Sequence, residues 1–504
     1  MSSILTNTSA MVALQTLKSI NSNLEGIQNE IATGKSISSA KDNSAIWAIS
    51  KVMESDVAGF KAISSSLSLG ESSVAVARQA SESVTDLLTQ MKGKIVAAQE
   101  ENVDRGKIQT DISALRDQIS SVTGAAQFNG LNMVKGTDDV NILSSLDRSS
   151  DGTVAASNIT VSRQDLTTEK GTFGTGTSLA ANTTASAATV ANTANTAVVT
   201  LATGWAAADV ANISVAGIDL AYTLGAGEDE THAAAGLSGL INGLGLDGIT
   251  ATVNAGALTI SSTRAFETLD VTSGETTAGA GTAQITALNG TTGLTATSGT
   301  IDERAENIAF STSAAVNEGD SYKVTIGSSS YDYIAGKNES MEDVAKGLKI
   351  AVDSAGLSDI STKIVKDATS GEWSLKVDNN GSSLGFSETG NADGKASGGL
   401  RGLEAIDVTS NAGATSALEN IETMISNSIS ASASFGSAQG RIETQGNFIS
   451  KLTDSLKAGI GSMVDADMEA ASARLQALQV QQQLGVQALS IANQAPQSVL
   501  SLFR

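Results

Sequence analysis

The sequence predicts a multidomain α + β protein. Its N- and C-terminal segments are expected to pair into a long antiparallel coiled coil or helical bundle, with a β-rich central region on the outside. Three observations predict this fold class. At both ends, apolar residues recur at alternating spacings of three and four. The middle is rich in Ala, Thr, Gly and Ser and contains short runs in which apolar and polar residues alternate. The chain of 504 residues is also too long to fold around a single hydrophobic core.

The N-terminal part contains three predicted helices. The first is expected to end at Gly34, because glycine commonly closes helices. The second begins after Asp42, its predicted N-cap, and the third precedes a turn at Phe128-Asn129-Gly130. The stripe of the first helix consists of Ala10, Ala13, Leu17, Ile20, Leu24, Ile27 and Ile31. The stripe of the second includes Phe60, Leu67, Val74, Leu88 and Ile95.

The C-terminal part mirrors this pattern with two predicted helices. The longer one carries Ile442, Ile449 and Leu456. The last helix starts near Met468 and is expected to stop near Pro496, because proline disrupts a helix interior. Its stripe includes Leu475, Leu478, Gln482, Gly485, Leu489 and Ala492.

Short alternating runs predict strands in the middle of the chain, and Gly or Asn turns separate them. The runs include 213–223, 251–254, 257–262, 322–326 and 373–377. One helix is predicted at 341–354, where Val344, Leu348 and Ala351 share a face. Together these elements indicate one or two small β-rich domains.

The charge distribution indicates which part of the chain faces solvent. Residues 140–400 hold 13 Lys/Arg and 29 Asp/Glu, so they supply −16 of the net charge of −22, and both ends are nearly neutral. Neutral helices can crowd together, whereas an acidic segment favours solvent. The acidic excess also argues against a nucleic-acid partner, which would require clustered basic residues.

Other classes of protein are also disfavoured by composition. The chain contains no cysteine, so disulfides and thiolate metal sites are excluded. No run of ~20 apolar residues predicts a membrane span. The first residues resemble no cleaved secretory signal, so we expect any export to use another route.

Several apolar side chains lie off the predicted seam between the terminal helices. A two-helix unit buries only the seam between its helices. Apolar surface left in water is unfavourable by ~25 cal/mol per Å². We therefore expect these helices to be loose in the monomer and to become ordered when neighbouring copies cover the second face. An ordinary closed bundle is the alternative. The residues concerned are Met11, Leu14, Val480, Leu484, Val486 and Ile491.

The two ends of the chain resemble those of bacterial flagellins. The most specific match is Ala492-Asn493-Gln494-Ala495-Pro496-Gln497, followed by Val499-Leu500. Ile4-Leu5-Thr6-Asn7, the Gly34–Ala45 segment and the turn at Gln127-Phe128-Asn129-Gly130 are similar to the same family. The resemblance covers about 130 residues at the start and about 90 at the end.

The resemblance implies a structural subunit that self-assembles into the extracellular flagellar filament for swimming, after unfolded export through the flagellar type III apparatus. It implies no enzyme activity and no cofactor. Its partners would be further copies, filament cap and hook-junction proteins, and an export chaperone. The implied parts are an N-terminal inner-core helix (1–41), N-terminal outer-core helices (42–136), a variable surface-exposed β-rich region (137–410), a C-terminal outer-core helix (411–466) and a C-terminal inner-core helix (467–504).

Two sets of residues are assigned on this basis. Inner-core assembly is expected to involve Leu17, Ile20, Leu24, Ile27, Ile31, Leu475, Leu478, Leu489, Val499 and Leu500. Outer-core packing is expected to involve Phe60, Leu67, Val74, Leu88, Ile95, Ile442, Ile449 and Leu456.

One segment departs from the family pattern. Many flagellins present an Arg-x-Arg-Glu-Leu-Ala-x-Gln stretch to Toll-like receptor 5. The matching residues here are Met91-Lys92-Gly93-Lys94-Ile95-Val96-Ala97-Ala98-Gln99. The glutamate is missing, and a mid-helix glycine costs ~1 kcal/mol relative to alanine. The departure argues against recognition by this receptor.

The sequence contains few candidate motifs for metal or ligand binding. The single histidine, His232, excludes a two-histidine zinc site within the chain. The acidic cluster Glu228–His232 is interpreted as a solvated turn, with weak cation binding as the alternative. Gly171–Gly176 is interpreted as a linker, and Asp378-Asn379-Asn380-Gly381 as a hairpin turn.

Two other functions fit the sequence. A hook–filament junction protein shares the terminal helices but forms no long polymer. A secreted adhesin or enzyme would place its chemistry in the β-rich middle. Electron microscopy after induced assembly separates them, because only a filament subunit forms long tubes.

Overall fold

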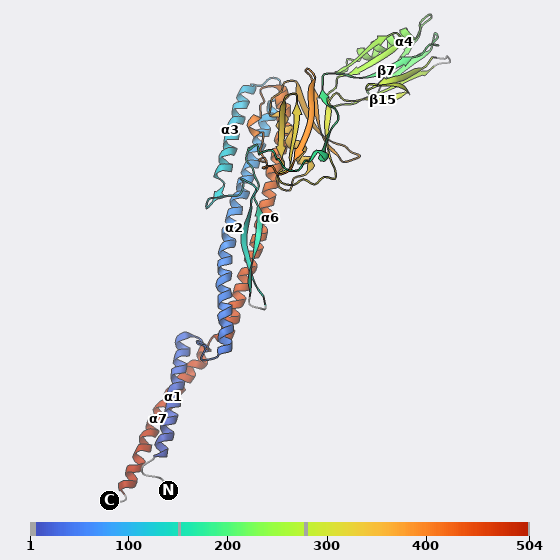
Figure 1. The fold of residues 1–504 in the computed structure, drawn as a ribbon. Coiled ribbons are helices and arrows are strands. Elements are labelled where there is room, and N and C mark those ends of the chain that lie inside the picture. Colours follow the sequence, from blue (N-terminus) through green and yellow to red (C-terminus); the bar gives the residue numbers. More distant parts are fainter. Residues whose placement is uncertain (1–6, 150–152, 277–280, 502–504) are drawn as a thin grey trace. The chain divides into compact units, whose positions relative to one another are not determined.

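The computed structural model describes residues 7–149, 153–276 and 281–501, with side chains up to residue 494 (Figure 1). The chain folds into two compact units. The first contains residues 1–74, 140–161 and 437–504, and the second contains 75–139 and 162–436. Two long helices, α2 (Ser44–Ala97) and α6 (Asn411–Val464), contribute to both units.

In the first unit, α1 (Thr8–Thr33) pairs with α7 (Met468–Ser501) (Figure 1). Helix α1 ends at Gly34 as predicted, because φ there is +69°, a conformation that glycine adopts without strain. The predicted stop near Pro496 is wrong, since α7 continues to Ser501. One turn before the proline, the backbone carbonyl of Ala492 accepts a hydrogen bond from the side chain of Asn7.

The predicted N-cap of α2 is wrong by one residue. The Oδ1 atom of Asn43 accepts hydrogen bonds from the backbone N–H groups of Ala45 and Ile46, each at 3.2 Å. The carboxylate of Asp42 instead accepts backbone hydrogen bonds from Ser38 and Ser39, at 3.0 and 2.9 Å. Hydrogen bonds from Ser39 and Ser38 hold the pKa of Asp42 below its usual value. This local turn competes for the carboxylate, so the neighbouring asparagine takes the capping role.

A two-stranded sheet of β3 (Asp139–Arg148) and β4 (Val154–Ser162) lies against α2. Two helix glycines mark the contact. A Cβ atom at Gly59 would lie 2.8 Å from Cδ1 of Leu146, and one at Gly70 would lie 2.6 Å from Cδ1 of Ile142. The hairpin therefore approaches the helix more closely than any larger residue would permit.

Helix α3 (Arg105–Ala125) leads into a small hairpin of β1 (Gln127–Phe128) and β2 (Leu131–Asn132). The predicted turn is confirmed, with φ of +50° at Asn129 and +81° at Gly130. Two consecutive residues with positive φ are typical of a two-residue hairpin turn.

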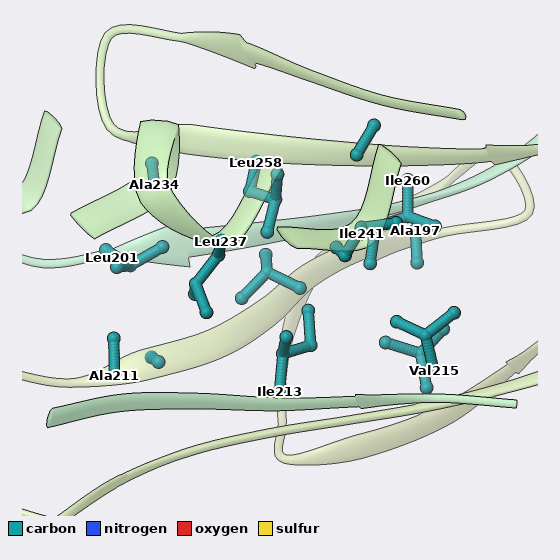
Figure 2. Packing of buried hydrophobic residues seen from close by; sticks show 14 of the residues in the cluster. Ala197, Leu201, Ala211, Ile213, Val215, Ala234, Leu237, Ile241, Leu258 and Ile260 are labelled. Carbon is teal, nitrogen blue, oxygen red and sulfur yellow. The ribbon is translucent and has the colours of Figure 1, made fainter. Parts of the chain in front are cut away.

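The first β module, residues 195–301, contains two antiparallel sheets ordered β10-β11-β7-β13-β14 and β15-β12-β8-β9. Helix α4 (Glu230–Gly243) packs its Leu237 and Ile241 side chains into the same hydrophobic core (Figure 2). The strands are β7 (Asn195–Leu201), β8 (Val210–Val215), β9 (Ile218–Thr223), β10 (Ile249–Asn254), β11 (Ala257–Ser262), β12 (Leu269–Thr276), β13 (Ala283–Leu288), β14 (Thr291–Ala296) and β15 (Ser298–Ile301). Sequence analysis missed α4.

The second β module, residues 183–190 and 306–391, also contains two antiparallel sheets, ordered β19-β20-β16-β5 and β18-β17-β21-β6. The helix predicted at 341–354 is confirmed as α5 (Met341–Asp353). The predicted hairpin at Asp378–Gly381 is wrong, because the strands on either side of it, β20 and β21, belong to different sheets. The strands are β5 (Thr183–Ala185), β6 (Thr189–Val190), β16 (Glu306–Phe310), β17 (Ser321–Ile326), β18 (Ser329–Ile334), β19 (Ile360–Lys366), β20 (Trp373–Asn379) and β21 (Leu384–Asn391).

The two β modules share a repeated unit of strand, strand, helix, strand, strand. It comprises β8-β9-α4-β10-β11 in the first module and β17-β18-α5-β19-β20 in the second. In each, a tyrosine hydroxyl donates to a glutamate, Tyr222 to Glu228 at 3.1 Å and Tyr333 to Glu339 at 2.9 Å. The second pair lies 111 positions after the first. Contacts of the same kind at the same spacing indicate that the middle of the chain contains an internal repeat.

Candidate assembly surface

The seam between α1 and α7 is narrow and only partly buried. No residue of α1 is buried. The seam residues Leu17, Ile20 and Leu24 are half-buried, as are Leu475 and Leu489 across from them. The expected role of these residues in inner-core assembly stays a prediction.

The helices approach closely at Gly485. A Cβ atom there would lie 3.1 Å from Cδ1 of Leu17 and 3.7 Å from Cδ1 of Ile20. Of the other predicted inner-core residues, Ile27, Ile31 and Leu478 are half-buried. Val499 and Leu500 belong to α7, but their side chains lie outside the described part of the chain, as do Ile4, Leu5 and Thr6 altogether.

A second face of this helix pair carries uncovered apolar side chains. The exposed fraction is 63 % for Met11, 57 % for Leu484 and 69 % for Ile491. Exposed side chains of this size are unfavourable in water at ~25 cal/mol per Å². The other exposed apolar residues of the pair are Val12, Leu14, Met468, Val480 and Val486. The described first unit thus exposes several apolar side chains that a further molecule could cover.

Backbone hydrogen bonds join the two connections beyond this helix pair. Ser36 N–H donates to the carbonyl of Val464 at 2.8 Å, and Ala466 N–H donates to the carbonyl of Gly34 at 2.9 Å. The α1–α2 connection is therefore bonded to the α6–α7 connection. These bonds tie the start of one terminal helix to the end of the other within the first unit.

The predicted outer-core residues are apolar side chains of α2 and α6. Seven are buried, namely Phe60, Leu67, Val74, Leu88, Ile95, Ile442 and Ile449. Leu456 is half-buried. Sequence analysis missed a buried polar contact between the helices. Ser428 Oγ donates to the carbonyl of Ser81 at 3.0 Å and accepts from the hydroxyl of Thr85 at 2.9 Å. Because a hydroxyl needs specific partners when buried, this contact fixes the register of α2 against α6.

The receptor-like segment lies on α2 with its apolar residues inward. Met91 and Ile95 are fully buried, and Gly93 and Gln99 are exposed. Lys92 pairs with Glu422 of α6, and Lys94 Nζ lies 2.6 Å from Asp111 Oδ2 of α3. The lysines are therefore engaged in ion pairs within the second unit.

The acidic cluster at 228–232 forms the start of α4. Asp229 caps this helix and accepts hydrogen bonds from His232 and Thr231, which lower its pKa to about 2. His232 Nδ1 lies 2.7 Å from Asp229 Oδ1, and this contact raises the pKa of His232. The cluster is exposed to solvent, as that interpretation expects, but it forms a capping box at the start of a helix and not a turn. In the described ranges, no three His, Asp or Glu side chains are arranged to hold a metal ion.

The glycine-rich segment 171–176 is packed and not a free linker. Thr172 exchanges backbone hydrogen bonds with Lys395, both at 2.9 Å, and Gly176 N–H donates to the carbonyl of Ala392 at 3.0 Å. A Cβ atom at Gly174 would lie 2.0 Å from that carbonyl oxygen. The glycines therefore permit close backbone contact. Among the helices of the described residues, none has the length and hydrophobicity that a bilayer crossing requires.

Paired helical termini with exposed apolar side chains, joined to acidic β modules, define an α + β protein whose terminal helices leave apolar surface uncovered. Comparison with known proteins agrees. The profile for the bacterial flagellin N-terminal helical region matches residues 4–139, and that for the C-terminal helical region matches residues 418–503. Flagellin A of Rhizobium meliloti is 30 % identical over 512 residues, covering 100 % of both chains.

Two further comparisons show the range of similarity. Flagellin FljK of Caulobacter vibrioides is 40 % identical over 172 residues, which cover 33 % of this chain and 63 % of that protein. Flagellar hook associated protein-3 of Legionella pneumophila, a solved structure, has 9 % identity and a TM-score of 0.33, covering 82 % of this chain and 98 % of that one. The chain belongs to the bacterial flagellin family, and the full-length alignments include the middle that sequence analysis left unassigned.

Proposed function

We infer that the chain is the structural subunit of an extracellular bacterial flagellar filament. The observation that supports this role is the apolar face of the α1–α7 pair, which nothing in the described first unit covers. Family membership supplies the class of assembly, since flagellins are structural proteins. The role is mechanical and not catalytic.

Assembly proceeds by head-to-tail contacts that do not close, so copies form a helical tube and not a ring. The inner-core helices 1–41 and 467–504 make the innermost contacts, the outer-core helices 42–136 and 411–466 surround them, and the acidic region 137–410 faces solvent. Neighbouring copies cover Met11, Leu484 and Ile491, and the helices, loosely paired in the monomer, become fully ordered as they associate.

Further partners follow from this role. The unfolded chain leaves the cell through the flagellar type III apparatus with an export chaperone, and the folded subunit contacts filament cap and hook-junction proteins. Recognition by Toll-like receptor 5 is not part of the proposal. The lysines that replace the family's motif are paired with Glu422 and Asp111, and Gly93 stands at its centre.

The experiment compares seeded polymerisation of the full chain with three variants. Deleting residues 468–504 should leave a soluble monomer that forms no filament. Leu484→Gln should leave the monomer folded, because this side chain is already 57 % exposed. It should raise the critical concentration by about four- to twentyfold, because assembly can bury at most that exposed part of a side chain whose full burial contributes ~1.5–3 kcal/mol.

The matched control is Leu240→Gln, the same change on an exposed leucine of α4 in the first β module. It should polymerise like the unaltered chain. Normal filaments from the deletion variant, or equal effects of the two leucine changes, would contradict the proposal. A chain that forms only short caps on seeds would favour the junction-protein alternative.

A further inference from the structure

The interior of α7 contains a break in its backbone hydrogen bonding. Pro496 has no amide hydrogen, so it cannot donate to the carbonyl of Ala492, its i−4 residue. An unsatisfied carbonyl within a helix weakens it unless another donor takes the vacant place. The helix nevertheless continues to Ser501.

The missing donor comes from the N-cap residue of the partner helix. The Nδ2 atom of Asn7 donates to the carbonyl oxygen of Ala492 at 2.7 Å, across 485 positions of sequence. The Oδ1 atom of the same side chain accepts from the backbone N–H of Ala10 at 3.0 Å and so caps α1. The carbonyl of Asn7 accepts from Met11 N–H at 3.0 Å, the first hydrogen bond of α1.

These partners determine the orientation of the amide. A backbone N–H can only donate and a backbone carbonyl can only accept, so the oxygen must face Ala10 and the nitrogen must face Ala492. Asp, Ser and Thr cap helices about as well as Asn. Asp has no N–H group for the second bond, and Ser or Thr would have to reach both partners with one hydroxyl oxygen. Of these capping residues, asparagine alone carries its acceptor and its donor on two separate atoms.

We propose that Asn7 is a positioning residue that sets the register of α1 against α7 by capping one helix and satisfying the carbonyl that Pro496 leaves free in the other. The rest of the seam is apolar and repeats every three or four residues, so sliding by one repeat preserves similar contacts. Only one place on α7 has a proline-freed carbonyl, since Pro496 is the single proline of the chain. The expected effect on assembly rests on the proposed function. If α1 shifts its register along α7, neighbouring copies would meet a misaligned apolar face.

Another polar contact between these helices serves as the control. Gln482 Nε2 donates to Asn21 Oδ1 at 2.8 Å on the exposed side. Asn21→Asp keeps an acceptor there and introduces the same charge on the same helix as Asn7→Asp. It should have little effect.

The test is a double-substitution cycle on the full-length chain, read first by amide hydrogen exchange of α1 and α7 in the monomer. Asn7→Asp keeps the cap and removes the second bond, so exchange should become roughly three- to tenfold faster in both helices. Pro496→Ala restores the N–H group, so Asn7→Asp in that background should change exchange by less than about twofold. The critical concentration for seeded polymerisation should follow the same order.

Three results would overturn the proposal: unaltered exchange in Asn7→Asp, an equal effect of that change with and without Pro496→Ala, or α1 and α7 amides that lack protection in the unaltered monomer. The exchange measurement does not depend on polymerisation. If the cycle holds while the unaltered chain forms no polymer, the filament role fails and the positioning role stands.

Discussion

Replacing glycine by alanine should have different effects on stability at two positions of α2. Alanine in a helix interior is more stable than glycine by ~1 kcal/mol when nothing else changes. Gly93 is exposed and no atom lies within 4 Å of its Cβ position, so Gly93→Ala should stabilise its segment by up to ~1 kcal/mol. At Gly70, which is buried, a Cβ atom would lie 2.6 Å and 2.7 Å from two carbon atoms of Ile142. Overpacking of this kind costs ~1–3 kcal/mol, so Gly70→Ala should be neutral or destabilising by up to ~2 kcal/mol.

The assay is native-state amide exchange, read separately for the α2 segments around each glycine. The two variants should differ by ~1–3 kcal/mol in local opening free energy. Adding Ile142→Ala to Gly70→Ala removes the clashing atoms, so the double variant should be less destabilised than the separate effects predict. Equal stabilisation by Gly70→Ala and Gly93→Ala would refute the close packing of the β3–β4 hairpin on α2.

Two further expectations concern charged groups of the second β module. Burial beside Tyr333 raises the pKa of Glu339 from 4.5 to about 7, so the folded form retains a proton that the unfolded chain loses. The free energy of unfolding of the module should therefore fall as pH rises from about 4.5 to about 7, by at most ~3 kcal/mol. In amide exchange of α5, Glu339→Gln should flatten this dependence on pH. Amide exchange of α5 in the unaltered chain that shows no such loss of stability would contradict the expectation. Asp378 forms a buried ion pair with Arg304 through two hydrogen bonds, both of 2.8 Å. In urea unfolding, Asp378→Ala should lower the free energy of unfolding by ~3–5 kcal/mol, whereas Glu267→Ala, at an exposed carboxylate, should lower it by under ~1 kcal/mol. Similar losses in the two variants would refute the difference between buried and exposed pairs.

The helical ends were predictable because their information is local. Apolar spacing locates a helix, and a glycine such as Gly34 marks its end. Helix α4 was missed because Gly236, Gly239 and Gly243 weaken its helical pattern. The reason for Gly236 appears only in three dimensions, since a Cβ there would lie 2.2 Å from the ring of Tyr222. A glycine that is needed for close packing thus lowers the helix propensity of its segment, and the sequence pattern no longer indicates a helix.

The errors at Asp378 and Pro496 have a related cause. Turn residues indicate that a chain reverses but not which strands pair afterwards, so the sequence predicts a hairpin where the structure has a connection between two sheets. Proline predicts a helix end when only its own segment is considered, whereas the donor that satisfies Ala492 comes from Asn7 at the other end of the sequence. Exposure of the terminal apolar residues was anticipated, and their role in assembly stays a prediction.

The most direct test of the filament role compares amide hydrogen exchange in the monomer with that in the sedimented polymer of the full chain. The terminal helices α1 and α7 should gain strong protection on assembly, because neighbouring copies cover their second apolar face. The core strands of both β modules, such as β7 and β17, should exchange alike in the two states. Protection gained in the β modules, with α1 and α7 unaltered, would contradict assembly through the terminal helices.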